Sequence, residues 1–98
     1  MAVKSDSLAD LDATALAALV RAGEVTAGEL VDGAIARCEQ VNGTLNAVIT
    51  EMFDGAREAA NSPLAEGPFA GVPFLMKDFA AEVAGVPFYE GSAFLDGY

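Results

Sequence analysis

The sequence is poor in the residues that most often carry catalysis or bind metals. Its 98 residues include no histidine and no tryptophan, and the one cysteine is Cys38. The lack of histidine excludes Ser-His and Cys-His catalysis within this chain and removes the commonest zinc ligand. A single cysteine excludes an intrachain disulfide and fits a reducing compartment. We therefore expect no metal and no cofactor, and we expect a cytoplasmic protein.

Basic residues are also scarce, because five Lys and Arg face fifteen Asp and Glu, for a net charge of −10. This balance argues against nucleic-acid binding, which needs clustered Lys and Arg, and disfavours attraction to an anionic membrane. No hydrophobic run approaches the length of a membrane span. Residues 1–6 lack the basic and then apolar stretches of a signal peptide. We expect neither a nucleic-acid nor a membrane partner.

What the chain has in quantity is apolar surface. Hydrophobic residues make up 53% of it, and its mean hydropathy is +0.36. Such a composition is too apolar for disorder and unusually apolar for a small soluble domain. The length allows one small domain or a piece of a larger one. We expect much of the apolar surface to need a partner surface, as in the N-terminal piece of a larger enzyme.

The hydrophobic pattern predicts three helices and two strands. The helices are expected at about 13–22, from Thr26 to near Asn42-Gly43, and at 50–61. The strands are expected at 47–49 and 72–76, where short apolar runs are bounded by breakers. The fold class is therefore α/β, with N-terminal helices leading into a mixed sheet that sequence beyond this chain would complete.

The remaining segments are expected to be irregular. Residues 1–12 form a polar lead-in, 62–67 a loop, and the part from Gly85 onward an ordered loop. Residues 79–83 fit either a helical turn or a strand.

The helix ends carry specific signals. Asp12 is placed to cap the first helix and Gly23 to stop it. Thr26 and Glu29, three residues apart, form a capping box for the second helix. Apolar side chains at helical spacing are expected to face inward: Ala15, Leu16, Leu19 and Val20 in the first helix, Leu30, Val31, Ala34, Ile35, Cys38 and Val41 in the second, and Phe53, Ala56, Ala59 and Ala60 in the third.

Lys77 is the candidate catalytic residue, because it closes the apolar run of the second predicted strand. A lysine desolvated by its neighbours favours the neutral amine and can act as a base. The alternative is an ordinary lysine at a strand end, which reaches water or pairs with Asp78. Residue type alone leaves both interpretations open.

The surrounding motif resembles the amidase signature family. That family reads Gly-Pro-Leu-x-Gly-Val-Pro, three apolar residues, Lys-Asp, and later Gly-Ser with a downstream Leu and Tyr. A looser match extends upstream to Glu29-Leu30, Asn42 and 45–48. The matching residues here are Gly67-Pro68-Phe69-Ala70-Gly71-Val72-Pro73, Lys77-Asp78, Val83-Ala84-Gly85, Gly91-Ser92, Leu95 and Tyr98.

The resemblance implies an amidase signature fold and a Ser-Ser-Lys triad. In that mechanism the lysine matching Lys77 takes a proton from a serine held by a cis peptide bond. That serine activates a nucleophilic serine, and the resulting acyl-enzyme is hydrolysed. The substrate would be a small carboxamide, with a preference for linear or cyclic aminohexanoate-type amides. Expected structural supports are Gly71, Asp78, Gly85, Gly91 and Ser92.

The triad cannot be complete in this chain. The family places both serines on a Gly- and Ser-rich loop well downstream of the lysine. The serines present are Ser5, Ser7, Ser62 and Ser92, and none lies in such a loop. We therefore expect residues 1–98 to be the N-terminal segment of a single amidase domain, inactive alone, with the remainder of that domain as its partner. Two alternatives are the ammonia-releasing subunit of the glutaminyl-tRNA amidotransferase and a non-catalytic module that folds against a partner.

Overall fold

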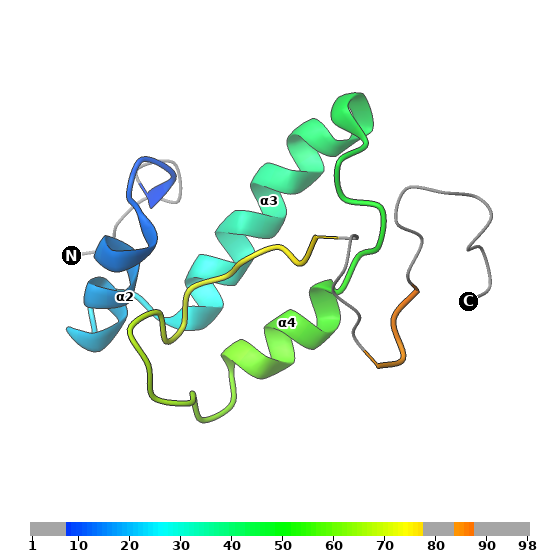
Figure 1. Ribbon diagram of the computed structural model, residues 1–98. Coiled ribbons are helices and arrows are strands. Elements are labelled where there is room, and N and C mark those ends of the chain that lie inside the picture. Colours follow the sequence, from blue (N-terminus) through cyan, green and yellow to red (C-terminus); the bar gives the residue numbers. More distant parts are fainter. Residues whose placement is uncertain (1–7, 78–83, 88–98) are drawn as a thin grey trace.

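The computed structural model describes residues 8–77 and 84–87, and this part of the chain contains three helices (Figure 1). They are α2 (Ala13–Arg21), α3 (Ala27–Leu45) and α4 (Phe53–Ala60). The long helix α3 packs against α4, and α2 lies near the N-terminal end of α3. All three predicted helices are therefore present, each with somewhat different ends.

Helix α2 begins and ends as the sequence indicates. The Asp12 side chain accepts a hydrogen bond from the Ala15 N–H at 2.8 Å. At the other end, Gly23 has φ +74, a left-handed conformation that costs glycine little. Its N–H donates to the Val20 carbonyl at 3.1 Å, and the next N–H, of Glu24, donates to the Leu19 carbonyl at 3.0 Å. These two bonds form a Schellman motif, which satisfies carbonyls at the helix end.

Helix α3 starts with the predicted capping box. The Glu29 N–H donates to Thr26 Oγ1 at 3.0 Å, and the Thr26 N–H donates to Glu29 Oε1 at 3.1 Å. The helix continues past the predicted end at Asn42-Gly43 to Leu45. It stops at Asn46, which has φ 50 and whose N–H donates to the Asn42 carbonyl at 2.7 Å. Asparagine tolerates the left-handed conformation, so the stop comes at Asn46 rather than at the Asn-Gly pair.

The core lies where α2 meets the first half of α3. Leu8, Val25 and Leu30 form a buried cluster, on which Leu16, Leu19 and Val20 pack. Leu8 falls within the predicted polar lead-in, and the sequence pattern does not indicate its burial. Further along α3 the apolar stripe leaves this core: Val31 and Ile35 are buried, Ala34 and Cys38 are half-buried, and Val41 is 48% exposed.

Helix α4 starts three residues later than predicted, at Phe53 instead of Thr50. Its first residues lack a side-chain cap, because Met52 at the N-cap makes no such hydrogen bond. Residues predicted to face inward are only partly covered. Phe53 and Ala60 are half-buried, whereas Ala56 and Ala59 are exposed. The apolar face of α4 therefore borders open space in this chain.

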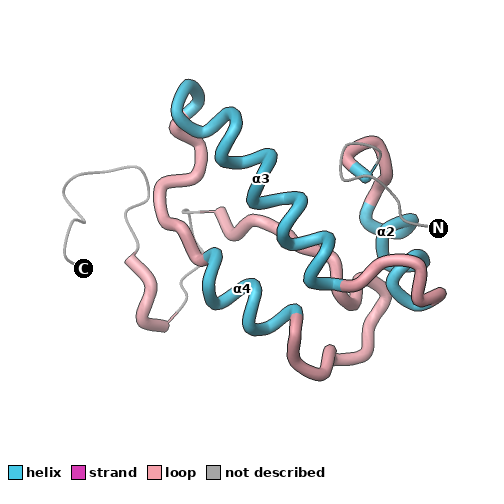
Figure 2. The backbone as a smooth tube through the Cα atoms, turned by 180° about the vertical axis from the view of Figure 1, so that it is seen from behind, coloured by secondary structure: helices cyan, strands magenta, loops and turns pink. Residues whose placement is uncertain are grey.

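Neither predicted strand forms within the part of the chain that the structure describes. Residues 47–49 and 72–76 are both irregular, and Figure 2 shows them as loop. A strand needs a neighbour to satisfy its backbone, and these two segments do not pair with each other. The loop predicted at 62–67 is present. The predictions for 79–83 and for most of the loop after Gly85 lie outside the described residues.

Candidate functional site

The candidate site is an apolar groove with a volume of about 690 Å³. Helix α3 forms one wall and α4 another, while the loop at 47–50, the segment 73–77 and residues 86–87 form the rest of its described border. In Figure 1 the yellow segment leading to Lys77 crosses the α3–α4 pair. Among the lining residues that the structure describes, only Lys77 carries a formal charge. The groove therefore offers apolar surface with one amine at its border.

Lys77 itself is exposed in this chain. The apolar side chains that were expected to desolvate it are exposed as well, with Phe74 at 79% and Leu75 at 78%. Within the described residues Lys77 has no ion-pair partner, and Asp78 lies outside them. In this chain the amine therefore meets water, and a base would need further surface to cover its surroundings.

The glycine motif before Lys77 forms a tight turn that fixes the path toward the groove. The Ala70 N–H donates to the Gly67 carbonyl at 3.3 Å, and the Val72 N–H to the Phe69 carbonyl at 3.1 Å. Gly71 has φ +86. A Cβ there would lie 3.1 Å from Val20 Cγ1 and 3.3 Å from the Ala27 Cβ. Glycine is thus required both by the backbone conformation and by close contact with α2 and α3.

Asn42 fixes the opposite border of the groove. Its side-chain Nδ2 donates to the Val48 carbonyl at 2.9 Å, and its Oδ1 accepts from the Val48 N–H at 2.8 Å. Both backbone groups of Val48 are thereby satisfied without a second strand. The sequence placed Asn42 in the family pattern but indicated no role for it. The sequence signal for this role is an amide side chain near a helix end, five residues before a short apolar run.

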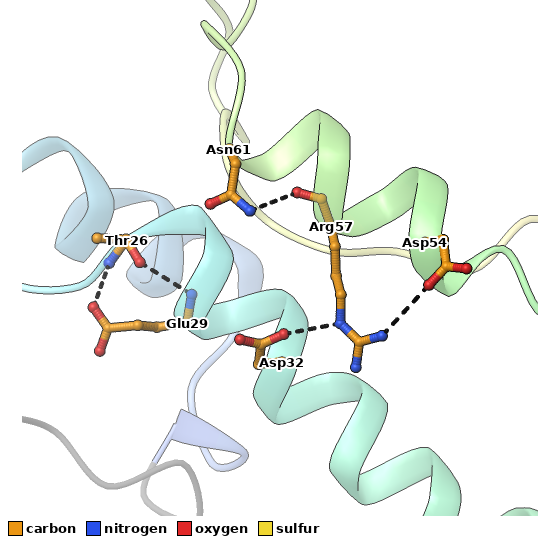
Figure 3. A network of polar contacts seen from close by, with 6 residues as sticks. All are labelled: Thr26, Glu29, Asp32, Asp54, Arg57 and Asn61. Atoms are coloured by element: carbon orange, nitrogen blue, oxygen red, sulfur yellow. Dashed lines mark hydrogen bonds and ion pairs between the residues drawn. The ribbon is translucent and has the colours of Figure 1, made fainter.

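A polar network holds α3 to α4 on the outer surface (Figure 3). Arg57 Nε donates to Asp32 Oδ1 at 3.2 Å, and Arg57 Nη1 lies 3.8 Å from Asp54 Oδ1. The Asn61 side chain donates to the Arg57 carbonyl at 2.9 Å. The Arg57 and Asp32 side chains are 45% and 66% exposed. Exposed pairs of this kind contribute about 0–1 kcal/mol, so the network orients α4 more than it stabilises the chain.

The other candidate residues are partly described. Gly71 supports the turn, and Gly85, with φ +78, lies in an exposed turn. Asp78, Gly91 and Ser92 fall outside the described residues. Within the described ranges no three Cys, Asp or Glu side chains gather as metal ligands would. No described helix has the length and hydropathy needed to cross a bilayer.

The family model for amidases matches residues 29–98. The "6-aminohexanoate-cyclic-dimer hydrolase" proteins of Pseudomonas sp. (strain NK87) and Paenarthrobacter ureafaciens are each 54% identical over 67 residues, covering 68% of this chain and 13% of theirs. A glutamyl-tRNA(Gln) amidotransferase protein of Lachnospira eligens is 40% identical over 81 residues, covering 74% of this chain and 16% of its own.

The chain spans less than a fifth of the length of these curated relatives. No solved structure matches it. The family match covers the glycine turn and Lys77, which the sequence motif singled out, and it also covers the groove lining between 31 and 87. The chain therefore belongs to the amidase family.

Proposed function

We propose that the complete protein hydrolyses amide bonds by a Ser-cisSer-Lys mechanism in which Lys77 is the general base. The observation that carries the proposal is the motif at 67–78, which lies within the amidase match and ends at Lys77 on the border of the groove. The reaction would take place in the cytoplasm on a small carboxamide.

The chemistry places clear demands on Lys77. A serine hydroxyl is a weak nucleophile and needs a positioned base. The ordinary pKa of a lysine amine is about 10.4, so the amine is a base near neutral pH only where its surroundings disfavour the ammonium. Phe74, Leu75 and Met76 supply apolar neighbours, which are exposed here. Covering them with the rest of the domain would create the required environment.

The two serines of the mechanism would come from sequence outside this chain. The available serines lie at positions 5, 7, 62 and 92, and none is in a Gly- and Ser-rich loop. The 98-residue chain would thus supply one of three triad members. Reading the coding DNA past Tyr98 tests this directly. A continuous frame with a Gly-Gly-Ser-Ser-Gly-Gly-type loop supports the proposal, whereas a stop codon without a partner gene for those serines overturns it.

The role of Lys77 is tested by two substitutions in the complete enzyme. Lys77→Arg keeps a positive charge but cannot act as a base, and Lys77→Ala removes both. Each should lower kcat/KM by at least about 100-fold while the protein remains folded. Lys4→Arg, at the other lysine of the chain, is the matched control and should leave kcat/KM unchanged. Retained activity in Lys77→Arg would show that Lys77 acts through its charge and not as a base.

For the substrate, we propose linear or cyclic amides of the aminohexanoate type. The support is the 54% identity to two proteins named as 6-aminohexanoate-cyclic-dimer hydrolases. A second candidate is the subunit of a glutaminyl-tRNA amidotransferase that releases ammonia from glutamine inside a complex; the amidotransferase relative supports it. Release of 6-aminohexanoate units by the complete protein alone favours the first. Glutamine-dependent ammonia release that requires a partner subunit encoded next to it favours the second.

The apolar excess and the missing serines also fit a non-catalytic module that lends surface to a partner. Activity and the Lys77 variants separate this possibility from the amidase. If the isolated chain were monomeric, cooperatively folded and stable in denaturant titration, it would not need a partner, and the proposal that it is a fragment would weaken as well.

A further inference from the structure

Helix α2 closely approaches the motif that ends at Lys77, and it does so at Gly71. A Cβ at Gly71 would lie 3.1 Å from Val20 Cγ1 of α2 and 3.3 Å from the Ala27 Cβ at the start of α3. Leu64 Cδ1, in the loop that follows α4, would also lie 3.3 Å away. The turn that leads to Lys77 therefore packs against side chains from α2, from α3 and from this loop (Figure 1).

Helix α2 has no role in the amidase match, because that match begins at residue 29 and α2 spans Ala13–Arg21. The helix is nevertheless firmly placed. Both of its ends are capped, and Leu19 and Val20 pack on the buried core cluster described above. A helix held at its ends and along one face offers a fixed surface to the turn at Gly71.

The segment from Gly71 to Lys77 is short, and it begins with a stiff dipeptide. Proline fixes its own φ and restricts the residue before it to extended backbone. Val72 and Pro73 are both half-buried, so they have little freedom to change direction. A shift of Gly71 is therefore passed on toward Lys77 instead of being absorbed within the turn.

We propose that Val20 is a positioning residue of the amidase reaction: it holds Gly71 in place and thereby sets the position of Lys77. This inference rests on the proposed function, because it takes Lys77 to be the general base. A base must lie within hydrogen-bond reach of the proton that it takes. A misplacement of about 1 Å can lower a rate by about 100-fold. Loss of the Val20 methyl groups should therefore slow the chemical step and leave substrate binding unchanged.

The test compares Val20→Ala with Leu19→Ala in the complete protein. Both changes remove apolar atoms that pack on the same core cluster, but of the two side chains only that of Val20 is among the three nearest to a Cβ at Gly71. We expect Val20→Ala to lower kcat about 10-fold with KM within about 2-fold of wild type, as for a small misplacement of the base. Leu19→Ala should keep kcat within about 2-fold although its unfolding midpoint falls at least as much. Equal kcat values in the two variants overturn the proposal.

A compensating pair of substitutions tests the contact itself. Gly71→Ala introduces the Cβ that would lie 3.1 Å from Val20 Cγ1, and Val20→Ala removes that Cγ1. The double variant loses more core packing than Gly71→Ala, yet we expect its kcat to be at least about 3-fold higher, a coupling of the size found for residues in contact. With a purely structural role activity would follow stability, so a double variant no more active than Gly71→Ala overturns the proposal. If Gly71→Ala does not fold, the comparison of Val20→Ala with Leu19→Ala decides alone.

Amide hydrogen exchange of the peptide containing residues 72–77 measures the support by α2 without using activity. We expect exchange at least about 5-fold faster in Val20→Ala than in Leu19→Ala, because only the first change frees the turn locally. Equal exchange in the two variants overturns the proposal.

The exchange measurement also keeps this proposal apart from the proposed function. If the complete protein hydrolyses no amide, or if Lys77→Arg is fully active, the proposed function fails. Faster exchange in Val20→Ala then still supports the hold of α2 on the segment, and equal exchange overturns it. If Lys77→Arg is inactive but Val20→Ala and Leu19→Ala agree in kcat and in exchange, α2 has no positioning role and the amidase function stands.

Discussion

The side chain of Asn42 makes both hydrogen bonds to Val48 that a residue of a neighbouring strand would make. Its Nδ2 donates to the Val48 carbonyl at 2.9 Å, and its Oδ1 accepts from the Val48 N–H at 2.8 Å. One side chain near the end of α3 therefore holds the chain that follows Asn46 beside the groove. The left-handed turn at Asn46 brings the two residues together.

We expect Asn42→Ala to lower the free energy of unfolding by about 1–2 kcal/mol, because two part-buried hydrogen bonds are lost at once. Asn42→Asp keeps the acceptor for the Val48 N–H but loses the donor. Its free energy of unfolding should therefore lie between those of the wild type and Asn42→Ala. Thr44→Ala, at an exposed position of the same helix turn, is the control. Urea unfolding measures all three, and equal midpoints for Asn42→Ala and Thr44→Ala would contradict the role of the two bonds.

Gly71→Ala should destabilise the chain by about 1–3 kcal/mol, since alanine at a positive φ is strained and its Cβ would lie 3.1 Å from Val20 Cγ1. Gly67→Ala in the same motif is the matched control. Nothing lies within 4 Å of a Cβ at Gly67, so its change should stay within about 0.5 kcal/mol. Thermal unfolding followed by circular dichroism compares the two, and similar losses would argue against a special need for glycine at position 71.

In α3 the same substitution has different expected effects on stability at two glycines. Gly43→Ala should stabilise by about 0.5–1 kcal/mol, because a Cβ at Gly43 meets nothing within 4 Å and alanine has the higher helix propensity. At Gly28 a Cβ would lie 3.0 Å from Asn61 Oδ1, so the gain should be reduced or reversed. The difference in unfolding free energy between the two variants is the test. A larger gain at Gly28 would mean that α3 and α4 do not approach as described.

Thr26→Ala should lower the free energy of unfolding by about 1 kcal/mol, because it removes the oxygen that accepts a hydrogen bond from the Glu29 N–H at 3.0 Å. Thr26→Ser keeps that oxygen and should behave like the wild type. The double variant Thr26→Ala, Glu29→Ala should cost less than the sum of the two single changes, since both bonds belong to one capping box. Strict additivity in denaturant titration would show that the two bonds act independently.

The helix predictions succeeded where the signal is local. The Asp12 cap and the stop at Gly23 depend on neighbours within a few residues, and so does the capping box of Thr26 and Glu29. The end of α3 lies beyond the predicted stop at Asn42-Gly43, a residue pair that often ends helices. Asn46, which adopts the left-handed conformation, ends the helix instead. Both positions carry residues that can end a helix, and the surrounding chain determines that α3 ends at the second one.

The two predicted strands show that local sequence patterns are not sufficient to predict a sheet. Residues 47–49 and 72–76 have apolar patterns suited to a sheet, yet both are irregular in the part of the chain that the structure describes. A strand is stabilised by partners far away in sequence. An apolar pattern suited to a strand therefore does not form one in the described part of the chain, where no such partner is present. The amidase match supports the sheet only through the family. A sheet completed by sequence beyond Tyr98 stays a prediction.

Some features of the candidate site could be predicted from the sequence, and others could not. The motif that ends at Lys77 and its family could be read from residue order, because they depend on spacing and residue type alone. The groove between α3 and α4, the support of its border by Asn42, and the exposure of Phe74 and Leu75 came from the tertiary structure. Residue order by itself determined the presence of the helices, the caps at Asp12 and at Thr26 with Glu29, and the family, because those depend on short-range contacts and spacing. Only the folded chain decided which apolar surface is buried and which stays open, because burial depends on residues distant in sequence meeting in space.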